Sequence, residues 1–181
     1  MFVLATLAIG TMVLTTASWA LKPKSVGPAS APDPALHPDA VVQVYGADVW
    51  GVRGRFAIHT WIAVKGVNAE RYTKYQVIGW RQRRGLPVVS ISNDNPDGNW
   101  FGSEPVLLLD HRGAAAEDVI DAVHAAALSY PFADEYVMWP GPNSNSFTAW
   151  IGLEVPGLGL DLPAKAIGKS WMADAYPELQ N

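Results

Sequence analysis

A serine that could act as a nucleophile, Ser144, lies where the chain turns into an expected helix. Residues 140–151 read PGPNSNSFTAWI, so a Pro-Gly-Pro turn precedes four small polar residues and an apolar run. The first turn of a helix has unpaired N–H groups and the positive end of the helix dipole, which stabilise a developing anion. Because Ser and Asn are also preferred N-cap residues, Ser144 either caps the helix or attacks a carbonyl. In the second case Asn143, Asn145 and Ser146 would contribute to binding, and N–H groups of the Asn145 turn would hold the oxyanion.

A serine hydroxyl needs a general base, and His59 is the best candidate. His59 lies inside the expected strand 55–65, where alternation places it on the same face as Trp61. The alternative interpretation is a half-buried histidine held by a hydrogen bond. Eight tryptophans are many for this length. They indicate either core packing or a groove for lipid or glycan, and Trp61 would then contribute to binding.

Composition limits the classes of function. The net charge is −4, and no basic face is evident beyond Arg81, Arg83 and Arg84, so we expect no nucleic-acid partner. The absence of cysteine excludes disulfides, thiolate metal sites and a cysteine nucleophile. The loop 93–104 holds most of the spacing of a calcium loop, but its first residue is Asn and its Pro-Asp-Gly run is an ordinary turn. We therefore expect no metal and no other cofactor.

The first part of the chain indicates export or anchoring. Residues 1–20 are uncharged and largely apolar, about the length that crosses a bilayer, and they end in a small-x-small pattern. We expect them to form a signal peptide or a hydrophobic membrane-anchor helix, although the basic residues follow this segment instead of preceding it. The protein would then lie in the cell envelope, anchored in the inner membrane or exported to the periplasm. Residues 21–40 contain five prolines and are expected to form a linker.

Residues 41–181 are expected to form a single α+β domain. Strand patterns precede helix patterns along the chain, which favours an antiparallel sheet with packed helices. Strands are expected at 41–45, 55–65, 72–81, 88–92 and 106–110, and helices at 117–129 and 145–155.

The domain resembles a known family. Residues 55–61, 75–80, 100–102, 140–151 and 166–169 are similar to an uncharacterised bacterial family of unknown function, number 3750. The PGPNSN and AWI runs carry most of this resemblance, which covers nearly the whole domain. The family implies no established activity.

A more distant resemblance is to circularly permuted papain-like enzymes, such as lecithin retinol acyltransferase relatives and the bacterial NlpC-type group. These enzymes place a histidine on an early strand and an Asn-Cys-x-x-Phe run later, at the start of a helix. Residues 143–147 read NSNSF, with Ser144 at the cysteine position. The resemblance implies a third, orienting residue on the next strand, for which Gln76 or Tyr75 would serve. Serine ionises far less readily than cysteine, so the site is either a serine variant or an inactive relative that only binds.

Two hypotheses follow. The first is an envelope hydrolase or acyltransferase that acts on an amide or ester of a cell-wall peptide or a lipid. Its catalytic residues would be Ser144, His59 and Gln76. The second is a non-catalytic binding or scaffolding module of the envelope, in which the polar run is only a helix cap.

Overall fold

The protein is built around one antiparallel sheet. The computed structural model describes residues 27–28 and 30–177. Their strands lie in the order β1-β6-β2-β3-β4-β5, and every neighbouring pair is antiparallel. The strands are β1 (Gly27–Pro28), β2 (Val41–Asp48), β3 (Ile58–Lys65), β4 (Thr73–Val77), β5 (Val89–Ser92) and β6 (Val106–Arg112). The expected α+β architecture with an antiparallel sheet is confirmed.

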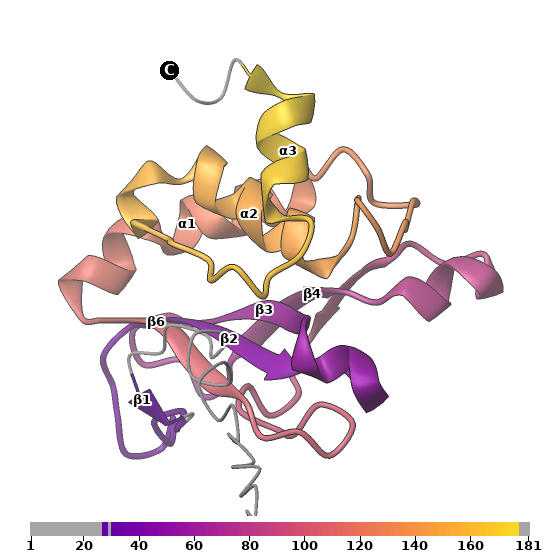
Figure 1. Ribbon diagram of the computed structural model, residues 1–181. Helices are drawn as coiled ribbons and strands as arrows, with labels where there is room; N and C mark the ends of the chain where they lie inside the picture. Colours follow the sequence, from indigo (N-terminus) through magenta and orange to yellow (C-terminus); the bar gives the residue numbers. More distant parts are fainter. Residues whose placement is uncertain (1–26, 29, 178–181) are drawn as a thin grey trace, which may run out of the picture.

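The three α-helices of the described residues all lie on the same side of the sheet (Figure 1). They are α1 (Ala114–Leu128), α2 (Ser144–Glu154) and α3 (Lys169–Ala175). The larger core cluster fills the space beneath them, where Ile62 and Val64 of β3 meet Val123 of α1 and Ile151 of α2. The short helix α3 was not expected, because its seven residues are too few to show a clear apolar period.

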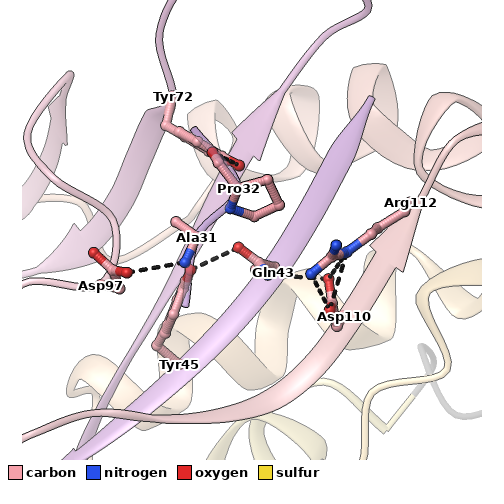
Figure 2. A network of polar contacts seen from close by, with 8 residues as sticks. All are labelled: Ala31, Pro32, Gln43, Tyr45, Tyr72, Asp97, Asp110 and Arg112. Carbon is pink, nitrogen blue, oxygen red and sulfur yellow. Dashed lines mark hydrogen bonds and ion pairs between the residues drawn. The ribbon is translucent and has the colours of Figure 1, made fainter. Parts of the chain in front are cut away.

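The other face of the sheet carries a second core cluster and a chain of polar contacts. Tyr45 and Trp61 stack there with ring centroids 5.5 Å apart. Figure 2 shows the polar chain: Tyr45 Oη donates to Gln43 Oε1 at 2.6 Å, and Gln43 Nε2 donates to Asp110 Oδ1 at 3.0 Å. Asp110 also forms an ion pair with Arg112 at 2.9 Å. The buried Tyr45 and Gln43 side chains therefore have hydrogen-bond partners within this chain of contacts.

Part of the stretch expected as a linker packs against this second face. The Ala31 amide donates to Asp97 Oδ2 at 2.9 Å, and Tyr72 Oη donates to the Pro32 carbonyl at 3.0 Å (Figure 2). Pro32 is buried. The described part of the Pro-rich segment thus packs on the sheet. Its prolines have no backbone N–H, so their burial leaves no hydrogen-bond donor without a partner.

Two strands are shorter than expected, because a 3-10 turn adjoins each. η2 (Gly51–Arg55) precedes β3, and η3 (Gly79–Arg84) follows β4. At Gly79 a side chain would come within 2.6 Å of the Tyr136 ring. The chain therefore bends at a position where only a glycine fits beneath an aromatic ring from another segment. Both η2 and η3 project at the same end of the sheet (Figure 1).

The signal peptide or anchor helix expected at residues 1–20 lies outside the described residues. Among the residues that the structure describes, no helix combines the length and the apolar character needed to cross a bilayer.

Truncation in the core under the helices should be costly, whereas truncation on the last strand should not. Ile62 is fully buried, and Ile91 of β5 is 45% exposed. We expect Ile62→Ala to lower the free energy of unfolding by about 2–5 kcal/mol through lost burial and a residual cavity. The matched change Ile91→Ala should cost about 1 kcal/mol or less. Equal losses in denaturant unfolding would contradict this assignment of the core.

Candidate functional site

A cavity of about 390 Å³ opens at the end of the sheet where β3 begins. Its walls come from η2, the start of β3, Trp80 of η3, the turn at Trp100 and Phe101, the segment 136–139 and the start of α2. Both His59 and Ser144 line it. The structure thus brings two of the predicted catalytic residues to one cavity, although they are 85 positions apart in the sequence.

His59 is held by the residue predicted to orient it. His59 Nε2 and Gln76 Oε1 are 3.2 Å apart, and the imidazole stacks on the Trp100 indole with ring centroids 3.7 Å apart. The amide oxygen accepts the hydrogen of Nε2, which leaves Nδ1 with the lone pair that a general base needs. Gln76 therefore fixes both the ring orientation and the tautomer.

Burial keeps His59 neutral. The imidazole is 4% exposed, and desolvation lowers its pKa from 6.5 to about 4. The hydrogen bond that His59 donates to Gln76 opposes this shift, and the charge of Lys74 adds to it. A neutral imidazole can accept a proton at pH 7, but a base with such a low pKa accepts it weakly.

Tyr75, the alternative orienting residue, points elsewhere. Its hydroxyl lies 2.8 Å from Nδ1 of His124 on α1, on the helix side of the sheet. Alternation along β4 therefore separates the two candidates and leaves Gln76 beside His59.

Ser144 begins α2 and reaches the cavity from the helix side of β3. It is 6% exposed, its carbonyl accepts a hydrogen bond from Thr148 Oγ1 at 3.1 Å, and Thr60 Oγ1 lies 3.4 Å from the same carbonyl. His59 lies on the opposite face of β3 from Thr60 and meets the cavity at the strand end. Among the hydrogen bonds of the described residues, none joins the Ser144 hydroxyl to His59. A substrate or a water molecule would have to connect them.

The polar run around Ser144 forms a capping box. Asn143 Oδ1 accepts hydrogen bonds from the amides of Asn145 and Ser146, at 2.9 and 3.1 Å. Ser146 Oγ accepts from the Asn143 amide at 3.3 Å and donates to the Gly168 carbonyl at 2.8 Å. Within this turn, the N–H groups of Asn145 and Ser146 are already used by the cap and are not free to hold an oxyanion. The Ser144 N–H is then the candidate donor at this helix start.

Asn145 is a clamp between α2 and β3. Its Nδ2 donates to the carbonyls of Ile58 and Ile167 at 3.0 and 2.9 Å, and its Oδ1 accepts from Thr60 Oγ1 at 3.0 Å. Asn143 and Asn145 both line the cavity, yet these bonds engage their side chains. Ser146 is fully buried and does not line it.

Trp61 lies apart from the cavity. It is 2% exposed and donates from Nε1 to the Pro96 carbonyl at 2.7 Å within the second core cluster. The loop that resembled a calcium loop is thus tied to β3 by its proline carbonyl and to the Pro-rich segment by Asp97. No group of three or more potential metal-binding side chains occurs in the described part of the chain.

The sequence reasoning missed the aromatic walls of the cavity. Trp80 and Trp100 stack with centroids 5.7 Å apart, and Phe101 packs edge-on against both. Trp50 and Trp139 are 75% and 74% exposed at the same cavity. The high tryptophan content left core packing and a groove as alternatives, and spacing alone could not show which indoles would meet.

Buried His59 should make the protein less stable in mild acid. Because its folded pKa is about 4 and its usual value is 6.5, the unfolded chain binds the proton first as pH falls. The free energy of unfolding should therefore fall through this window, by roughly 3 kcal/mol between pH 7 and pH 4 from this group alone.

The measurement is urea unfolding from pH 7 to 4 for the wild type and His59→Gln. The variant should lose this part of the pH dependence, whereas His37→Gln, at an exposed histidine, should keep it. An unchanged slope in His59→Gln would show that His59 is not buried neutral.

The comparisons with known proteins agree with the first resemblance. No curated protein and no solved structure matches the chain significantly, so the likeness to papain-like enzymes has no support from them. A family model does match, over residues 39–171, which is most of the chain and all of the cavity's walls. The chain belongs to the family described as "Protein of unknown function (DUF3750)".

Proposed function

We propose that the protein is a hydrolase or acyltransferase that cleaves an ester or amide of an apolar substrate at this cavity. One observation carries the proposal: Ser144 at a helix start and an oriented, neutral His59 line the same cavity. The mostly aromatic walls favour a lipid over a cell-wall peptide, since a peptide backbone needs more polar partners than these walls offer.

The chemical step would follow acyl transfer by a serine. Ser144 Oγ attacks the carbonyl carbon while its proton passes to His59 Nδ1, directly or through one water molecule. The oxyanion forms beside the Ser144 N–H and the positive end of α2. The intermediate collapses, the leaving oxygen or nitrogen takes the proton from His59, and the acyl group stays on Ser144. Water or an acceptor alcohol then releases it by the reverse sequence.

The orienting residue sets an expectation for the rate. Gln76 carries no charge, so it orients His59 without stabilising the imidazolium that forms during the attack. An amide that keeps the reactive tautomer still supplies no negative charge beside the imidazolium, and the low pKa of His59 makes it a weak base. Turnover by this protein should therefore be slow, and activated esters should be better substrates than amides.

We also propose a permuted papain-like arrangement for the domain. The histidine strand β3, the adjacent strand β4 with Gln76 and the later helix α2 with Ser144 occur in the order that such enzymes use. Residues 1–20 would place this domain in the cell envelope, anchored to the inner membrane or exported to the periplasm.

Labelling with a fluorophosphonate probe tests the nucleophile. We expect Ser144→Ala to abolish labelling and His59→Ala to slow it about 10²-fold or more, because the hydroxyl would lose its base. Ser170→Ala, at an exposed serine outside the cavity, is the matched control and should label normally. Circular dichroism would check that each variant is folded. Labelling that neither Ser144→Ala nor His59→Ala changes would refute the catalytic pair.

A non-catalytic binding module is the second candidate, favoured by the absence of a Ser144–His59 hydrogen bond in the described residues and by the low pKa of His59. In that case the wild type should not label. It should still bind a probe such as octanoate with the same affinity in Ser144→Ala, and Trp100→Ala should weaken binding. Tryptophan fluorescence titration would measure both.

A further inference from the structure

The mouth of the cavity is surrounded by exposed apolar side chains, here named the rim. They come from η2 and its flanks, from the turn after Trp100, and from the segment before the Pro-Gly-Pro turn. The members are Trp50, Val52, Phe56, Phe101, Met138 and Trp139, each between 58% and 75% exposed. Five of the six line the cavity itself, and Val52 lies between Trp50 and Arg53, which do so. A concentration of large apolar groups at one opening marks a contact surface for an apolar partner.

Arginines accompany the rim. Five of the seven arginines in the sequence lie in η2 and η3, which contain no acidic residue. Arg53 reaches across the mouth, where its Nη1 lies 3.6 Å from the sulfur of Met138. Two acids, Asp134 and Glu135, precede the segment 136–139, so arginines outnumber acids on these elements although the whole chain has a net charge of −4. The charge at this end is therefore opposite to that of the molecule as a whole.

We infer that the rim docks on the surface of an anionic lipid bilayer, with its indoles among the headgroups and the arginines of η2 and η3 on the lipid phosphates. Tryptophan prefers the membrane interface because one edge of the ring is apolar and the other polar. Arginine side chains can bury their stems while the guanidinium meets a phosphate. A soluble protein partner would not require exposed apolar groups to surround an apolar cavity beside two arginine-rich turns. A bilayer does, because it would present acyl chains directly at the mouth.

The inference does not depend on Ser144. Docking needs only the rim and the arginines, and it would serve a lipid-binding module as well as an enzyme. Failure of the catalytic proposal and failure of this one can thus be told apart.

The experiment uses the full chain, which has no cysteine of its own. Val52→Cys, at the rim, and Val67→Cys, after the far end of β3, would each carry the fluorophore NBD. Val52 is 73% exposed and Val67 is 50% exposed, so both labels start in water. The protein is reconstituted with phosphatidylcholine vesicles, with or without phosphatidylglycerol. Quenching by a spin-labelled phosphatidylcholine reports which label meets the bilayer.

With phosphatidylglycerol, we expect the label at Val52 to be quenched several-fold more than the label at Val67, and to shift to shorter wavelength. Changing Arg81, Arg83 and Arg84 together to Gln should reduce quenching at Val52 to the level seen in phosphatidylcholine alone. Arg71→Gln, at an exposed arginine away from the cavity, and Ser144→Ala should leave it unchanged.

Equal quenching at the two positions would overturn docking at the rim. Quenching at Val52 that neither phosphatidylglycerol nor the three arginine changes affect would overturn recognition of an anionic surface. A label at Val52 that leaves water only when a soluble protein is added, and not when vesicles are added, would assign the rim to that protein instead.

Discussion

The arrangement of this domain depends on the attachment of the first turn of α2 to the start of β3. Thr60 Oγ1 lies 3.0 Å from Asn145 Oδ1 and 2.9 Å from Thr148 Oγ1, while Asn145 Nδ2 reaches the Ile58 carbonyl. These groups are buried, so each bond that is lost would leave a desolvated polar group behind. The attachment fixes the helix start beside the strand that carries His59, and the cavity is the space left at their junction.

The two faces of β3 pack against different core clusters. Ile58, Ile62 and Val64 pack under the helices, whereas Trp61 and Ala63 belong to the cluster on the other face. His59 is the member of the second set that lies nearest the strand start, where the cavity opens. Its stack on Trp100 and its bond to Gln76 keep it there, at the cost of a much weakened base.

Much of the fold could be predicted from the sequence because its segments have clear periods. The alternation in residues 58–65 and the apolar stripe of α1 predicted the right elements, and Pro-Gly-Pro followed by Asn143 predicted the start of α2. The ends of β3 and β4 were wrong because η2 and η3 depend on distant contacts, as the Tyr136 ring over Gly79 shows. The papain-like resemblance left Gln76 and Tyr75 as alternatives for the residue beside His59, and Gln76 is the one that lies there. The aromatic walls join four separate segments, and no local pattern states which of them converge.

The packed Pro-rich segment changes how far the domain can travel from whatever precedes it. Residues 30–40 would be free chain if they were a linker, and 11 extended residues could span up to about 40 Å. Held by Asp97 and Tyr72, they contribute none of that reach. The short β1 pairing with β6 takes up Gly27 and Pro28 as well. Residues 30–40 would therefore add no free length between this domain and a point of attachment upstream. The missing length would limit the range of orientations in which the open end of the domain can face a neighbouring surface.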